Sequence, residues 1–213
     1  MAMMTNIQHF MDYGHISEIP PRAAKLRDFL GQIIRVSTAT GEDEIGIASA
    51  LRCQKRPNRK RCEGTILIRR EEVLGPFIFW ICSDCRDEGR IEGHVGSPYD
   101  LSQGESLLAT KKDDQLLNVK LSLEEYEAWI AGDFIPYDLD SQRLVYSARY
   151  FEDVVDLDAY ESDLDILCDC IAADDNHEQS RKRKNLLDSV FNKVSGVLDA
   201  ALELEIKPTQ VLH

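Results

Sequence analysis

Residues 51–89 read LRCQKRPNRKRCEGTILIRREEVLGPFIFWICSDCRDEG and hold four of the six cysteines of this 213-residue chain. The cysteines form two pairs, Cys53 with Cys62 and Cys82 with Cys85. Two runs rich in β-branched and aromatic residues, TILIRR and FIFWICS, lie between the pairs and are typical of strands. Because a hairpin of these strands would return the second pair beside the first, the stretch predicts a β-hairpin closed by a four-cysteine site.

Four thiolates at the corners of a tetrahedron are the usual ligands of a structural zinc ion. The spacing Cys53-x8-Cys62-x19-Cys82-x2-Cys85 resembles that of a zinc ribbon, and the resemblance covers residues 48–96. It implies one structural Zn²⁺ bound by these four cysteines. A second interpretation stays open, in which four reduced cysteines pack without a metal.

The first pair departs from the ribbon pattern, because eight residues, QKRPNRKR, stand where a ribbon knuckle has two. His94 is an alternative ligand should one cysteine not take part, although we expect it to be an exposed loop residue. Glycines follow both pairs, at Gly64 and Gly89. Small residues allow the backbone amides of a thiolate-binding turn to point at sulfur, so both glycines fit such a site.

The same stretch carries the densest positive charge of the chain, with eight basic residues and one acid between Leu51 and Arg70. Cations on a loop suit contacts with phosphate, and zinc ribbons often serve nucleic-acid machinery. The stretch therefore predicts a nucleic-acid-binding surface, with Phe77 and Phe79 as stacking rings and Trp80 in the core. The cations assigned to this surface are Arg52, Lys55, Arg56, Arg59, Lys60, Arg61, Arg69 and Arg70.

The chain as a whole is acidic, with a net charge of −13 and a sequence pI of about 4.8. Residues 152–178 contain eleven Asp and Glu and no Lys or Arg. Such a chain repels nucleic acid overall, so any contact has to be local. Two alternatives follow: the basic loop docks on residues 152–178 of its own chain, or the acidic half binds a basic protein and acts as an interaction or regulatory adaptor.

Composition narrows the class of protein. A hydrophobic content of 43% and a charged content of 30% are typical of a packed globular chain. No signal-like start and no apolar run of about 18 residues is present, so we expect a cytoplasmic protein with reduced cysteines and no membrane partner. No Gly-rich phosphate loop, nucleophile elbow or HExxH motif occurs. The sequence therefore assigns no catalytic residue, and it leaves the oligomeric state undetermined.

Hydrophobic periodicity predicts an α+β protein in which a hairpin module accompanies a small mixed domain with a long C-terminal amphipathic helix. The expected parts are an N-terminal arm at 1–20, a helix and linker at 21–47, the zinc-ribbon-like module at 48–96, and an acidic α+β domain at 97–213. Residues 1–16 of the arm are expected to be loose or adaptable. Outside the module, we expect helices at 21–39, 123–131, 159–173 and 181–204, and strands at 115–121, 143–151 and 154–157. Ser122 and Glu125 are predicted to form a capping box.

Residues 174–178, DDNHE, follow the predicted 159–173 helix. The layout of the chain is similar to that of a family of uncharacterised bacterial proteins. These proteins join a cysteine module, with an aromatic residue before its CxxC, to a downstream helix with an acidic-Asn-His stretch. The resemblance implies no activity. We expect DDNHE to be a polar break before the last helix, whose basic start either pairs with these acids or contacts an anionic partner. The alternative is a metal-dependent enzyme that uses 174–178.

Cys168 and Cys170 lie two residues apart on the predicted 159–173 helix, so they cannot bind one metal ion together there. We expect Cys170 on the apolar face of this helix.

Overall fold

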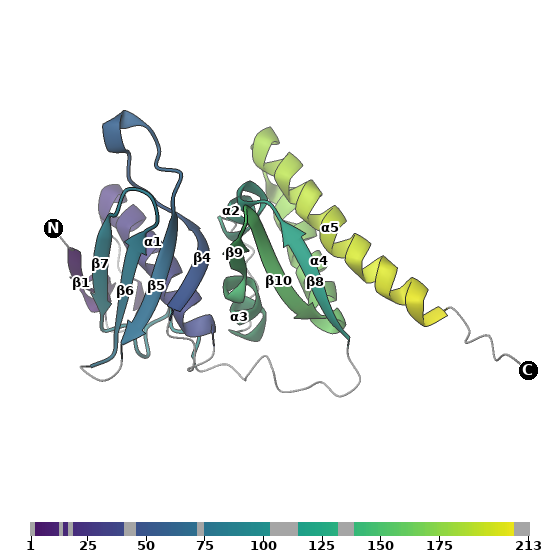
Figure 1. Ribbon diagram of the computed structural model, residues 1–213, viewed down its shortest axis with the longest axis horizontal. Helices are drawn as coiled ribbons and strands as arrows, with labels where there is room; N and C mark the ends of the chain where they lie inside the picture. Colours follow the sequence, from purple (N-terminus) through teal and green to yellow (C-terminus); the bar gives the residue numbers. More distant parts are fainter. Residues whose placement is uncertain are drawn as a thin grey trace, which may run out of the picture.

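Figure 1 shows the fold as a computed structural model, which describes residues 3–12, 15–16, 19–40, 46–71, 75–102, 115–131 and 139–206. Within these residues, five α-helices accompany a mixed eight-stranded sheet of order β1-β7-β6-β5-β4-β9-β10-β8. The prediction of an α+β protein is confirmed. The division into four parts is not tested by this architecture and stays a prediction.

The first half of the sheet contains the cysteines. Its strands are β1 (Met3–Asn6), β4 (Gly46–Arg52), β5 (Thr65–Glu71), β6 (Phe77–Cys82) and β7 (Glu88–Glu92). Helix α1 (Pro21–Ala39) covers one face, and the Phe29 ring meets Trp80 edge to face at 5.6 Å. Trp80 is 3% exposed, so the prediction that it belongs to the core is confirmed.

The N-terminal segment is more ordered than the predicted loose arm. Strand β1 pairs in parallel with β7, and the short helix η1 (Ile7–Phe10) follows it with Ile7 fully buried. A two-stranded ladder of β2 (Met11–Asp12) and β3 (His15–Ile16) comes next. The expectation of a loose arm is therefore wrong for these elements, because β7 offers a free edge that β1 completes.

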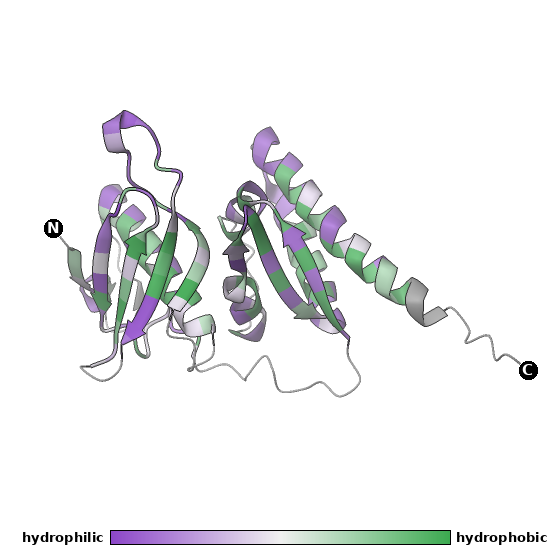
Figure 2. Cartoon of the chain, in the orientation of Figure 1, coloured by the Kyte–Doolittle hydropathy of each residue, from purple (hydrophilic) through white to green (hydrophobic). Residues whose placement is uncertain are grey.

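The second half of the sheet contains β8 (Leu116–Leu121), β9 (Arg149–Phe151) and β10 (Val154–Tyr160). Its helices are α2 (Leu123–Ile130), α3 (Leu139–Ser147), α4 (Glu161–His177) and α5 (Arg181–Ile206). Buried apolar residues of all four helices belong to the same core as those of the strands. Figure 2 shows apolar and polar residues alternating along α5. The two halves meet where Ser49 of β4 pairs with Arg149 of β9.

The order of elements agrees with most of the sequence-based expectations. The structure contains the β5–β6 hairpin, the β9–β10 hairpin, the strand at 116–121 and the helices at 21–39, 123–130 and 181–206. The Ser122–Glu125 capping box is formed, with hydrogen bonds in both directions. Among the described helices, none has both the length and the apolar composition needed to span a bilayer.

Two expectations were wrong. Residues 143–147 lie in α3 rather than in a strand, because Leu144, Val145 and Tyr146 are all buried in a helix that packs on several neighbours. Helix α4 continues through His177, so the polar break begins at Glu178 and not at Asp174.

The prediction for the two helical cysteines is also corrected. Cys168, rather than Cys170, packs against the apolar core. Burial, with Asp165, Asp169 and Asp199 nearby, raises the pKa of Cys168 to about 11. Cys168 is therefore a protonated packing residue at neutral pH.

Candidate metal centre

The β5–β6 hairpin brings the two cysteine pairs together as predicted. Ile66 stands opposite Cys82 in the hairpin register, which places the Cys82–Cys85 turn beside the loop base at Cys53 and Cys62. The Sγ–Sγ distance is 3.6 Å for Cys53 and Cys85 and 3.6 Å for Cys62 and Cys82. All four sulfurs lie within 4.8 Å of one another.

These distances fit a shared metal ion and do not fit disulfides. A disulfide needs sulfurs about 2.05 Å apart, and all the cysteines are free. Four sulfurs arranged tetrahedrally at about 2.3 Å from a metal lie about 3.8 Å from one another. The four cysteines could therefore hold a metal ion. They form the one group of three or more metal-ligand side chains found among the described residues.

The eight-residue insertion does not disturb the first pair, because backbone hydrogen bonds close its base. The Cys53 amide donates to the Gly64 carbonyl at 2.9 Å, and the Cys62 amide donates to the Lys55 carbonyl at 3.0 Å. The two cysteine segments therefore run side by side. The intervening residues project above the sheet as a loop, which is visible at the upper left of Figure 1.

Backbone amides point at the sulfurs. The Lys55 amide lies 3.4 Å from the Cys53 sulfur, and the Asp84 amide lies 3.4 Å from the Cys82 sulfur. Burial raises the pKa of Cys62 to about 11 and that of Cys53 above its usual range. Burial raises the pKa of Cys82, but hydrogen bonds from the amides of Asp84 and Cys85 and from the Cys62 and Cys85 thiols outweigh it, so the pKa of Cys82 is lowered. Amide donors of this kind orient and stabilise thiolate ligands.

The two glycines have different roles. A Cβ atom on Gly64 would lie 2.7 Å from the Cys82 sulfur and 2.8 Å from the Asp84 amide nitrogen, so only glycine fits against the second turn. Gly89 lies in β7, where a Cβ would meet the Trp80 indole at 2.7 Å. Gly89 therefore allows strand packing, and the predicted role in a sulfur-binding turn is wrong for it.

Comparisons of the chain with protein-family models, with curated proteins and with solved structures gave no match. The likeness to a zinc ribbon and to an uncharacterised bacterial family therefore stays a prediction from the residues.

His94 does not belong to the cysteine group, and the expectation that it is exposed was wrong. It is 7% exposed and lies near Asp100 and Arg70. Burial lowers the pKa of His94 despite the opposing charge of Asp100. His94 begins the 94–102 segment, where the Asp100 carboxylate accepts from the amides of Gly96 and Ser102 at 2.8 and 2.9 Å.

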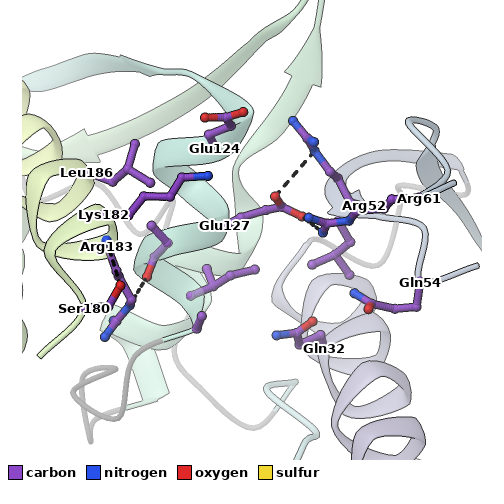
Figure 3. A pocket seen from close by; sticks show the side chains of 14 residues that line it. Gln32, Arg52, Gln54, Arg61, Glu124, Glu127, Ser180, Lys182, Arg183 and Leu186 are labelled. Carbon is purple, nitrogen blue, oxygen red and sulfur yellow. Dashed lines mark hydrogen bonds and ion pairs between the residues drawn. The ribbon is translucent and has the colours of Figure 1, made fainter. Parts of the chain in front are cut away.

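Of the predicted basic residues, Arg52, Lys55 and Arg61 pair with acids of the same chain. Glu127 of α2 pairs with Arg61 at 2.7 Å and with Arg52 at 3.5 Å, as Figure 3 shows. Lys55 pairs with Asp87 at 3.3 Å. The basic loop therefore docks on its own chain, as one alternative predicted, but its partners Glu127 and Asp87 lie outside the predicted residues 152–178. Glu127 fixes the base of the loop to α2, and Asp87 fixes Lys55 to the turn between β6 and β7.

A cavity of about 390 Å³, lined by both polar and apolar side chains, lies between the loop base and the start of α5. Figure 3 shows Gln32, Gln54 and Arg52 on one side and Lys182 with Arg183 on the other. The Arg183 Nε donates to the Ala128 carbonyl at the end of α2 at 2.9 Å. Helix α2 therefore joins both walls of the cavity.

The tip of the loop remains exposed. Arg56, Arg59 and Lys60 are exposed, and no ion pair is recorded for them among the described residues. A tight turn at Pro57–Arg59 presents them, with positive φ angles of 53° at Asn58 and 64° at Arg59.

The two remaining predicted cations lie elsewhere. Arg69 is on the opposite face of the sheet from α1, above the Phe79 ring at 5.3 Å. Arg70 reaches the Thr40 carbonyl at 3.5 Å. The predicted basic surface is therefore divided between a loop tip, a docked base and the sheet.

The DDNHE cluster binds the start of α5. Arg183 pairs with Asp174 and Glu178, and Lys184 pairs with Asp175 at 3.1 Å. Asp174 is 5% exposed, which shows that this network is part of the α4–α5 interface. The expected pairing with the basic start of the last helix is confirmed, and these carboxylates are occupied by ion pairs.

Sequence reasoning missed the partners of Glu125. Its carboxylate accepts from Ser189 at 2.7 Å and from Lys193 at 2.7 Å, both on α5, in addition to the Ser122 amide at 2.6 Å. Ser189 and Lys193 are four residues apart and therefore lie on one face of the predicted last helix. This spacing could have indicated that the two side chains share a partner. Glu125 fastens α2 to α5.

Proposed function

We propose that the protein is a non-enzymatic zinc-binding protein that contacts nucleic acid through residues 54–61, the loop closed by its metal site. The zinc ligands are Cys53, Cys62, Cys82 and Cys85. Four thiolates at tetrahedral spacing favour zinc over harder cations, which prefer oxygen ligands. With four protein ligands, no coordination position is left for a substrate, so the role of the metal is structural. Free thiols of this kind persist in the reducing cytoplasm, which is the location we propose.

The observation that carries the nucleic-acid function is the position of Arg56, Arg59 and Lys60. They project from the sheet at the tip of a loop whose two ends are metal ligands. Binding to phosphate orders both the side chains and the backbone of a loop, and each costs conformational entropy. A turn held at both ends has already lost most of its backbone freedom, so that part of the cost is small. An exposed cation cluster on an otherwise acidic chain suits local contact with phosphates.

The test is the salt dependence of binding to a fluorescently labelled oligonucleotide. The double variant Arg56→Ala/Arg59→Ala should reduce the slope of log affinity against log salt by about 1.4 for a single strand or about 1.8 for a duplex, since each lost phosphate contact contributes roughly 0.7 or 0.9. The matched control is Arg22→Ala/Lys120→Ala, which removes the same charge at exposed positions on α1 and β8. Equal slopes in the two double variants would refute the loop contact.

A second function is favoured by the exposed face of α4. Ile166 is 47% exposed between the exposed acids Asp165 and Asp169, a combination that suits a basic, partly apolar protein surface. In this alternative the zinc is purely structural and the chain is an adaptor. Absence of nucleic-acid binding together with capture of a defined basic peptide, lost in Asp165→Asn/Asp169→Asn, would favour it.

A further inference from the structure

The face of β5–β6–β7 that points away from α1 carries a cross-strand row of alternating charge and aromatic rings. In the register of the sheet, Arg69 stands opposite Phe79, and Phe79 stands opposite Arg90. Gly46 and Met4 complete the row on the two flanking strands. Two guanidinium groups therefore flank one phenyl ring on a single surface.

The next row of the same face is apolar. Leu67 stands opposite Ile81, with Ala48 beside Leu67 and Glu88 beside Ile81. Together the two rows line a groove of about 530 Å³. Leu67 is 39% exposed and Met4 is 69% exposed, and α1 covers the opposite face of the sheet. Exposed apolar side chains gathered in one groove are typical of a binding surface.

The rings and cations of this groove are held in place by one another. Phe77 and Phe79 meet edge to face with centroids 5.0 Å apart. Arg90 stacks on Phe77 at 3.7 Å and pairs with Glu92 at 2.5 Å, while Arg69 lies over Phe79 at 5.3 Å. Arg69 is exposed and has no recorded acidic partner among the described residues. Its charge is available to a ligand.

We infer that this groove binds an unstacked base of single-stranded nucleic acid, with Phe79 as the stacking ring and Arg69 as the contact to an adjacent phosphate. Arg69 lies over Phe79, so its exposed side chain moves off the ring when a base stacks there, and its guanidinium group then attracts the adjacent phosphate. A duplex keeps its bases stacked inside and cannot offer one to the groove. This inference rests on the proposed function, because the nucleic acid that contacts the loop would continue onto the sheet.

The distance between the two surfaces suits one short strand. Arg69 lies four residues along β5 from Thr65, which follows the loop base, and a strand rises about 3.3 Å per residue. The groove therefore begins about 13 Å from the loop base, a span that a few nucleotides of an extended single strand cover. An oligonucleotide of modest length can therefore contact the loop and the groove together.

The test compares Phe79→Leu with Phe151→Leu in binding to a labelled single-stranded oligonucleotide and to the same oligonucleotide made abasic. Phe151 is 67% exposed on β9, so the control makes the same change at another surface ring. Phe79→Leu should weaken binding to the intact strand at least about fivefold, the lower end of the loss for one stacked base. It should leave binding to the abasic strand unchanged. Phe79→Tyr retains a ring and should restore wild-type affinity, while a thermal melt verifies that each variant is folded.

The outcomes separate this inference from the proposed function. If the loop variant weakens binding while Phe79→Leu matches Phe151→Leu, the loop contact stands and the groove is overturned. If Phe79→Leu weakens binding and the loop variant does not, the groove stands and the loop contact fails. If the wild-type chain binds neither strand, both are overturned. Equal losses on intact and abasic strands would also overturn base stacking at Phe79.

Discussion

Gly64 lies so close to Cys82 that a Cβ atom at position 64 would stand 2.7 Å from the Cys82 sulfur. The contact joins the segment after the first cysteine pair to the turn that carries the second. No side chain fits here unless the Cys82–Cys85 turn moves, because the Asp84 amide nitrogen is only 2.8 Å from the same point.

Gly64→Ala should therefore separate the two turns and weaken metal binding at least tenfold, the lower end of the range for a disturbed outer partner of a metal ligand. The measurement is a competition titration with a zinc chelator. Gly196→Ala is the matched control, since a Cβ there meets open space within α5. Unchanged zinc affinity in Gly64→Ala would show that the turns do not need to lie in contact.

Glu127 connects the loop to the acidic half through Arg52 and Arg61, and Glu127→Gln should release both guanidinium groups. Partly exposed ion pairs are worth up to about 1 kcal/mol each, so the free energy of unfolding should fall by roughly 1 kcal/mol. Amide hydrogen exchange across residues 54–61 should become faster. The control is Glu124→Gln, an exposed acid three residues earlier in α2, and it should leave both values unchanged. Equal effects in the two variants would show that Glu127 does not hold the loop.

Glu125 should make stability dependent on pH. Burial alone raises the pKa of its carboxyl, but hydrogen bonds from Lys193, the Ser122 amide and Ser189 outweigh it and lower the pKa. The folded pKa is below the unfolded value of about 4.3, so the stabilisation is complete above that pH and is lost as pH falls through the folded pKa.

The corresponding variant is Glu125→Gln, measured by urea unfolding between pH 7 and pH 3. At pH 7 it should lose about 2 kcal/mol, the order of a buried hydrogen bond to a charged group. The difference from wild type should shrink toward acid. A difference that stays constant over this range would mean that the Glu125 charge does not contribute.

The cysteine site was predictable because its signal is local. Two cysteine pairs on either side of two β-prone runs allow few arrangements other than a hairpin that joins them. The α5 helix and the Ser122–Glu125 cap were equally readable, since periodicity and capping residues act within one or two turns.

The parts that escaped prediction depend on contacts distant in sequence. Arg61 and its partner Glu127 are 66 residues apart, and no pattern in either segment marks the pair. The run RLVYS was read as a strand because short apolar runs do not distinguish a strand from a helix buried on several sides. The Arg69–Phe79–Arg90 row exists only through the register of three strands, which the sequence of each strand does not specify.

Metal content measured on the purified 213-residue chain tests the central claim most directly. Elemental analysis combined with native mass spectrometry should find one zinc ion per chain in the wild type. Cys82→Ser should lose it, while Cys168→Ser, a cysteine outside the site, should retain it. A folded wild-type chain that contains no metal and takes up none when zinc is added would contradict the account.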